Sequence, residues 1–254
     1  MRIANWMLPV LSLVGLAALG GCASHAPTIA HTHIGHALTG WPDTPHQEGL
    51  FVAAQQYGKA ALKSAREADS ANDLATIKSD VAQVVKATSP DNAGEIAPDG
   101  HKVYGVKNAL TLAVRHIQFA GDSPDASANV RSSAKQFAKD AVPVLDRCDL
   151  IKALGINILN SPSKEEAKPL SRELLRLARA NVDGDDSNGD GVVGSVPSEY
   201  GLKQLRAELQ AMIDREDPPY TTVDTWYLFN LIRLPSGQWI FRQRSSDSGS
   251  YGGY

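Results

Sequence analysis

Apolar residues recur at the spacing of a helix face over most of the chain, and this pattern is the strongest constraint on its fold. Between residues 50 and 213 they return at intervals of three and four, which places them on one side of an α-helix. Examples from the successive stretches are Leu50, Ala54, Tyr57, Ala61; Ile77, Val81, Val84; Val106, Leu110, Ala113, Ile117; Val130, Ala134, Phe137; Leu170, Leu174, Leu177; and Leu205, Leu209, Met212. Such stripes on helices with short connections predict a mainly α chain with a helix bundle over 48–160.

Prolines and polar caps predict where these helices begin and end. Pro90 ends the second one, because proline lacks the N–H and its ring clashes with the preceding turn. Pro143 predicts a kink or a break in the fourth helix for the same reason. Ser163 and Glu166 have the spacing of a capping box, so another helix should start there.

The composition changes near the C-terminus. Thr221–Leu234 is dense in β-branched and aromatic residues, and Pro235-Ser236-Gly237 separates it from Gln238–Arg244. This pattern predicts a β-hairpin within 218–244. Residues 245–254 are Ser, Gly, Tyr and one Asp with little to bury, which predicts a disordered tail.

The N-terminus has the organisation of an export signal. Arg2 is the only charge before Cys22, and the apolar run Trp6–Leu19 ends in Gly20-Gly21. Such a segment is typical of a cleaved signal peptide, and it is short for a transmembrane helix. Leu19-Gly20-Gly21-Cys22 resembles the lipobox of bacterial lipoproteins, which implies removal of residues 1–21 and a lipid on Cys22. An ordinary signal peptide followed by an unrelated Cys is the alternative.

The expected location is the cell envelope. In the lipoprotein pattern an Asp after the Cys favours the inner membrane, and Ala23 at this position implies an outer membrane, facing the periplasm. Loss of Arg2 leaves 24 basic against 28 acidic residues. This weakly acidic balance argues against nucleic acid as a partner. The expected partners are the membrane, through the lipid, and an unidentified envelope protein. With Cys22 lipidated, Cys148 is left without an intramolecular partner, so no disulfide is expected.

An Asp- and Gly-rich stretch between two predicted helices resembles an EF-hand calcium loop. Alternating Asp and Asn followed by Gly191 supply the oxygen ligands and the tight turn that Ca²⁺ requires. The ligands that the resemblance implies are Asp186, Asn188, Asp190, the carbonyl of Val192, and Glu199. The resemblance therefore predicts an EF-hand-like helix–loop–helix over 161–217.

This loop departs from the family at its twelfth position, where Pro197 stands in place of a bidentate Glu. Glu199 can substitute only in a longer loop, which lowers the expected affinity. The alternative is a solvated connector, because Asp, Asn and Gly are ordinary turn residues. A single such loop outside the cytosol favours a structural role for Ca²⁺.

The segment 22–47 is rich in His and lacks an apolar period, and we expect an irregular tether or a packed loop. Its residues His31, His33 and His36 are candidate ligands for a transition metal such as Zn²⁺ or Cu²⁺. Solvated histidines in a polar tether are the alternative. His116 lies on an apolar helix, where a packed histidine is expected unless the N-terminal cluster folds back onto the bundle.

No motif of a known catalytic type is present, neither a nucleophile elbow, nor a phosphate-binding Gly loop, nor HExxH. We therefore assign no catalytic residue. The sequence favours a lipid-anchored, calcium-stabilised helical binding or structural module. The competing hypothesis is a transition-metal carrier or redox accessory protein that uses the His cluster.

Overall fold

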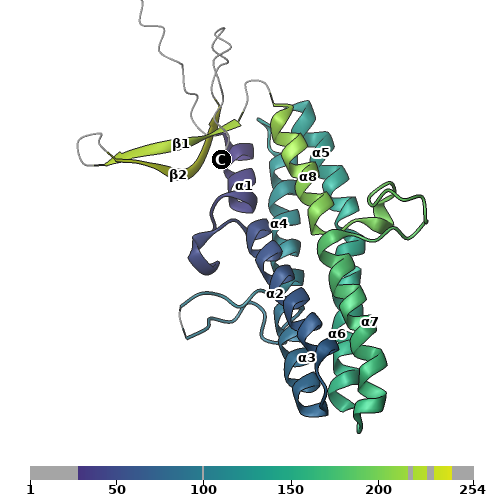
Figure 1. Cartoon of the computed structure of the whole chain (residues 1–254). Coiled ribbons are helices and arrows are strands. Elements are labelled where there is room, and N and C mark those ends of the chain that lie inside the picture. Colours follow the sequence, from purple (N-terminus) through teal and green to yellow (C-terminus); the bar gives the residue numbers. More distant parts are fainter. Residues whose placement is uncertain (1–27, 99, 217–219, 228–231, 242–254) are drawn as a thin grey trace, which may run out of the picture.

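The computed structural model describes residues 28–98, 100–216, 220–227 and 232–241, the last two ranges by their backbone only, and it is mainly α (Figure 1). The helices are α1 (Ile29–Leu38), α2 (Leu50–Ser70), α3 (Leu74–Thr88), α4 (Gly105–Asp122), α5 (Ala128–Asp140), α6 (Val142–Asn160), α7 (Lys164–Asp183) and α8 (Leu202–Asp214), with the short 3₁₀ turns η1 (Pro45–Gln47) and η2 (Pro197–Glu199). Within the described residues, no helix is both long and apolar enough to span a membrane.

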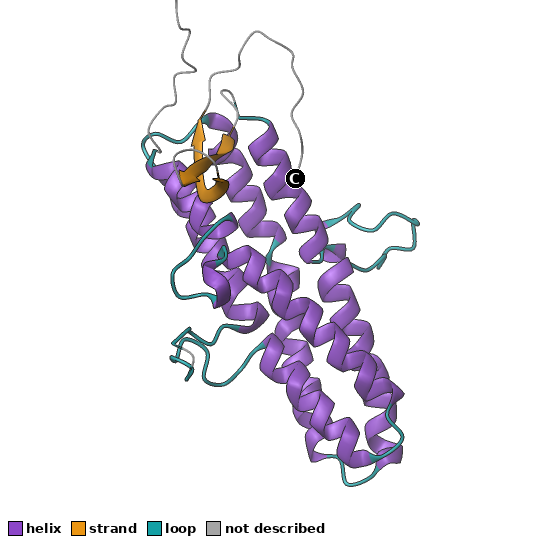
Figure 2. Cartoon of the chain, turned by 60° about the vertical axis from the view of Figure 1, so that its left-hand side comes forward, coloured by secondary structure: helices purple, strands orange, loops and turns teal. Residues whose placement is uncertain are grey.

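The helices form one elongated bundle in which α2 runs through both halves. In the lower half of Figure 1, α2 and α3 lie beside α6 and α7, and in the upper half α4 lies with α1, α5 and α8; the turned view of Figure 2 shows the same arrangement. The buried apolar side chains follow this division. One cluster includes Ile34, Phe51, Ile117, Phe137 and Leu205, and the other includes Leu62, Ile77, Ile151, Ile158 and Leu174.

Local sequence signals define several helix ends. Asp73, Ser127 and Ser163 each accept the backbone N–H of the residue three positions later, which satisfies one free donor of a helix start. The predicted break near Pro143 is confirmed, because α5 ends at Asp140 and α6 begins at Val142 with the proline in its first turn. A proline is tolerated there because the first helical N–H groups have no partner within the helix.

The N-terminal segment differs from the expected irregular tether. Residues 29–38 of the range 22–47 form α1, and its buried face of Ala30, Ile34, Ala37 and Leu38 packs into the upper core. Thr28 caps this helix in a reciprocal box with His31. Small and polar residues interrupt the apolar stripe of this helix, so the sequence pattern alone does not indicate it. Its packing against the bundle does. Residues 1–27, with Cys22 and the predicted signal peptide, lie outside the described part.

The C-terminal predictions fall mostly on residues that are not described. The backbones of β1 (Tyr220–Tyr227) and β2 (Ile232–Phe241) pair antiparallel. Their connection 228–231 lies outside the description, as do the side chains of both strands. The β-hairpin over 218–244 and the disordered tail over 245–254 therefore stay predictions.

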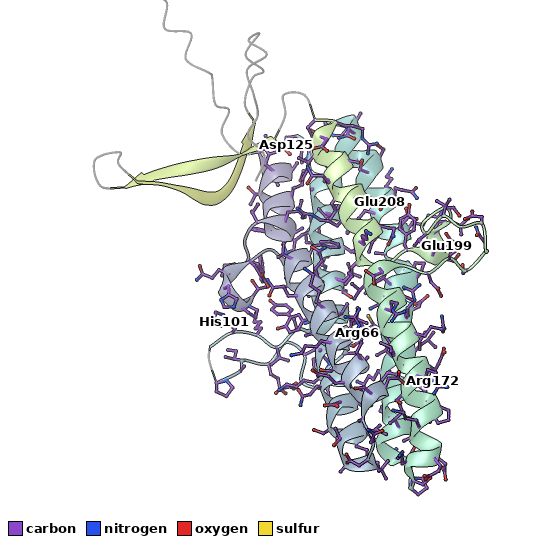
Figure 3. All side chains as sticks on the ribbon, viewed as in Figure 1. Arg66, His101, Asp125, Arg172, Glu199 and Glu208 are labelled. Atoms are coloured by element: carbon purple, nitrogen blue, oxygen red, sulfur yellow. The ribbon has the colours of Figure 1, made fainter. Side chains whose placement is uncertain are left out.

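Two acidic side chains meet between α5 and α8. Asp140 is buried and accepts a hydrogen bond from Gln136, and its carboxyl group interacts with that of Glu208 (labelled in Figure 3). One oxygen of each, Asp140 Oδ1 and Glu208 Oε2, is buried without a donor. Burial, followed by the neighbouring Asp140, raises the pKa of Glu208 to about 8, against a smaller opposing effect of Tyr200. The pair therefore holds a proton at neutral pH, which provides the missing donor.

This pair predicts a loss of stability as the pH rises from the acidic range to about 8. The folded state keeps the proton on Glu208 up to about pH 8, whereas the unfolded chain releases it near its ordinary value. Stability is therefore complete at low pH and falls as the pH rises toward and through 8. Glu208→Gln cannot ionise, and we expect it to remove on the order of 2 kcal/mol of this decline, after allowance for the partial exposure of Glu208.

Thermal melts from pH 6 to 9 in chelator check this expectation. Glu165→Gln, which changes an exposed acid at the start of α7, is the matched control. Equal declines for the Glu208→Gln variant and the wild type would refute the shared proton.

Candidate metal centre

Two helices far apart in sequence bring three histidines together. His33 and His36 are three residues apart on α1, which places them on the same side of that helix. His116 lies on the facing side of α4. All three are half-buried, at the edge of the apolar contact between the two helices.

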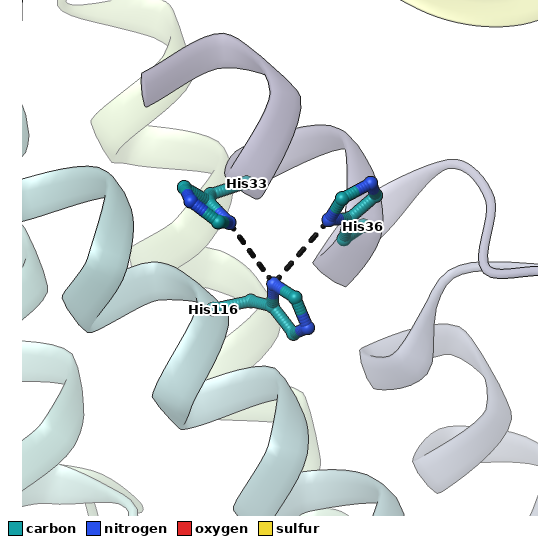
Figure 4. Close-up of side chains that lie close together, drawn as sticks. All are labelled: His33, His36 and His116. Carbon is teal, nitrogen blue, oxygen red and sulfur yellow. Dashed lines mark hydrogen bonds between the residues drawn. The ribbon is translucent and has the colours of Figure 1, made fainter. Parts of the chain in front are cut away.

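The three rings turn their Nδ1 atoms toward one another (Figure 4). The Nδ1 atom of His116 lies 3.1 Å from that of His33 and 3.3 Å from that of His36. One ligand atom from each ring lies within 4.8 Å of the others. Two imidazole nitrogens bound to one tetrahedral Zn²⁺, at about 2.0–2.1 Å each, stand roughly 3.3 Å apart. The two separations from His116 thus match those of ligands around a single ion.

Protons alone cannot satisfy this arrangement. A neutral imidazole nitrogen carries either one N–H or one lone pair. If the Nδ1 atom of His116 accepts from one neighbour, its only lone pair is used, and if it donates, it can serve only one acceptor well. One of the two short contacts therefore lacks a good hydrogen bond. A cation between the rings would accept a lone pair from each of them.

The surroundings keep these imidazoles neutral. Burial, followed by His36, His33 and Arg115, lowers the pKa of His116 to about 4. Burial also lowers the pKa of His33, against the opposing charge of Asp125, and burial and His33 together lower the pKa of His36. At neutral pH each ring therefore has one nitrogen without a proton, and the tautomer with the proton on Nε2 offers the Nδ1 lone pair to a metal.

Aromatic rings border the site. The ring of Trp41 lies 4.9 Å from the rings of both His36 and His116, between centroids. Phe119 lies 5.3 Å from His33. Among the described residues, no Cys, Asp or Glu joins the ligand group. The three imidazoles would therefore hold a metal as neutral nitrogen donors and leave further coordination positions to other ligands.

The observed group differs from the expected one in one member. His31 does not join His33 and His36. Its side chain is buried, and its Nδ1 atom accepts the backbone N–H of Thr28 at 3.1 Å, as part of the α1 cap. His116 takes the place assigned to His31. The N-terminal histidines fold back onto the bundle, and His33 and His36 on α1 thereby reach His116 on α4.

The Asp/Gly-rich loop between α7 and α8 is ordered by its own backbone. Asp186 accepts N–H groups from Gly189, Asp190 and Gly191, and the carbonyl of Val192 accepts from Ser195. These bonds use oxygens that the resemblance assigns to calcium. Among the described residues, the acidic groups of the loop do not approach one another as ligands do, so the structure shows no calcium site.

Glu199 nevertheless turns into this loop (Figure 3). It is fully buried, and its carboxylate accepts N–H groups from Asn188, Gly194 and Ser195. Burial acts to raise its pKa, but the hydrogen bonds from these three residues together outweigh burial and lower the pKa. Sequence reasoning placed Glu199 at the loop only as a substitute for position twelve, and the structure puts it at the loop's centre.

Arg147 on α6 fixes the base of this loop, and sequence reasoning missed it. Its guanidinium donates to the carbonyls of Ala180, Ser198 and Tyr200 at 2.9–3.2 Å, and the side chain is nearly buried. No signal in its own neighbourhood marks it, because an Arg on an amphipathic helix normally faces solvent.

Comparison with protein-family models, curated proteins and solved structures finds no match to the chain.

Proposed function

We propose that this chain is a lipid-anchored protein of the cell envelope that binds a transition metal, Zn²⁺ or Cu²⁺, through His33, His36 and His116. The observation that carries the proposal is the convergence of three neutral imidazole nitrogens at 3.1 and 3.3 Å. Imidazole is a common ligand of both metals. The location comes from the lipobox-like segment that ends at Cys22.

The site favours a role in carrying or buffering the metal. Its three ligands are half-buried at the rim of the α1–α4 contact, so an ion can reach them from solvent. Three neutral donors leave the charge of a divalent ion uncompensated. The ion would therefore recruit an additional donor, such as water or a group of an envelope partner.

Metal titration tests this function. We expect the detergent-solubilised protein, stripped with chelator and dialysed, to bind one equivalent of Zn²⁺ by calorimetry and elemental analysis. His116→Gln should weaken binding by more than about tenfold, because loss of a mere supporting contact to a ligand costs at least that much. His31→Gln is the matched control, since Gln can replace His31 in the cap of α1 and leaves the three ligands in place.

Two results would contradict the proposal. One is full affinity in the His116→Gln variant. The other is loss of binding in the His31→Gln variant, which would return the site to the ligand set expected from the sequence.

We propose in addition that the loop 186–199 binds Ca²⁺ as a structural ion. The position of the Glu199 carboxylate favours this proposal. The carboxylate is buried inside the loop and accepts the N–H of Asn188, so it lies next to one of the expected calcium ligands. Asp186, Asn188, Asp190 and the carbonyl of Val192 would complete the oxygen set through the lone pairs that their present hydrogen bonds leave free.

Calcium binding should raise the melting temperature. Millimolar Ca²⁺ acting on a site of roughly 0.1 mM affinity adds about 1–2 kcal/mol to the free energy of unfolding. The melts should use the His116→Gln variant, so that the histidine site does not contribute, with Asp190→Asn in the same background as the calcium-blind control. A melt that is unchanged by Ca²⁺ and by chelator would remove calcium from the proposal.

A further inference from the structure

Helix α1 is held to the bundle at three places. Its apolar face, with Ile34 and Ala37, is buried in the upper core. At its N-terminus, the Asp125 carboxylate accepts the N–H groups of Ile29 and Ala30 at 2.8 and 3.1 Å. Asp125 belongs to the connection between α4 and α5, so this bond fastens α1 to the rest of the chain. The third place is the contact of the histidine rings.

Of these three contacts, the one between the histidine rings is the contact whose strength depends on a bound metal ion. Without a cation, His116 can make only one good hydrogen bond to its two neighbours, for the reason given above. With a cation, the same three atoms become ligands of one ion. The first two fastenings do not change with metal.

The ligands are divided unequally between the two helices. His33 and His36 come from α1, and His116 comes from α4. An α1 that has left the bundle offers two imidazoles, whereas a docked α1 completes a set of three. A metal therefore binds the docked state more tightly, and by linkage it must favour that state.

We infer that metal occupancy of the His33/His36/His116 site strengthens the docking of α1 on α4, and that loss of the metal makes undocking of α1 easier. This inference rests on the proposed function and adds a regulatory consequence to it. Undocking separates His116 from His33 and His36, and the metal loses a ligand. Undocking of α1 and release of the metal therefore favour each other, which gives a carrier a way to give up its cargo.

The position of α1 gives its undocking a second consequence at the membrane. Ile29 follows Cys22 by seven positions, which span at most about 25 Å when extended, whereas Trp41, which is hydrogen-bonded to Tyr104, follows it by 19 positions, which can span up to about 65 Å. With a lipid on Cys22, docking of α1 would keep the bundle close to the bilayer. Undocking would let it reach farther.

Hydrogen exchange of the detergent-solubilised full chain tests the inference, with Zn²⁺ as the probe. We expect Zn²⁺ to slow exchange of the α1 amides at least tenfold in the wild type and in His31→Gln, and to leave it unchanged in His116→Gln. The last substitution is on α4, so an effect on α1 amides reports the link between the helices. Amides of α3, which is remote from the site, serve as the internal reference.

Zinc titration of the same samples separates the two ideas. One bound equivalent with metal-dependent protection of α1 supports the inference. One bound equivalent with unchanged α1 exchange overturns it and leaves the metal-binding function in place. Absence of binding in the titration overturns the proposed function itself, and the metal-dependent docking of α1 with it.

Discussion

The packing of α1 against α4 is the interaction on which the metal centre depends. A helix of ten residues has marginal stability by itself in water, since nucleation costs more than so few turns return. α1 exists because its apolar face is buried and because Asp125 and Thr28 satisfy its first N–H groups. The same docking brings His33 and His36 to His116, so the site and the helix that carries most of it form together.

The sequence predicted the elements that carry their own signals. The apolar stripes gave the long helices, Ser163 gave the start of α7, and Pro143 gave the boundary between α5 and α6. α1 was missed because its stripe is short and interrupted by His, Thr and Gly35. Its stability comes from tertiary contacts, among them the bonds to Asp125, which is 95 or more residues away in sequence. Periodicity within a short window does not contain that information.

The error in the ligand set follows directly from missing this helix. In a tether, His31, His33 and His36 are close neighbours and any of them can reach a common ion. In a helix, residues two apart point to different sides, whereas residues three apart share one. His31 is therefore turned into the cap and the core, and His33 and His36 face α4. Once residues 29–38 are recognised as helical, the pair can be predicted, but its third member still requires the packing of α1 on α4.

The two candidate sites differ in chemistry, and this difference separates their metals. The histidine site offers only neutral nitrogen atoms, which suit Zn²⁺ and Cu²⁺ and give Ca²⁺ none of the oxygen ligands it prefers. The loop offers carboxylates and carbonyls, which suit Ca²⁺. In the described structure those oxygens already accept the loop's own N–H groups, and their remaining lone pairs are the ones that calcium would use. The three imidazole Nδ1 atoms have no such partners in the described structure. Hydrogen bonds among them can satisfy only one of the two short contacts of His116. The histidine site thus lacks a satisfactory arrangement without an ion, whereas the hydrogen bonds of the loop already order it, and this asymmetry is why the metal-binding proposal rests first on the histidines.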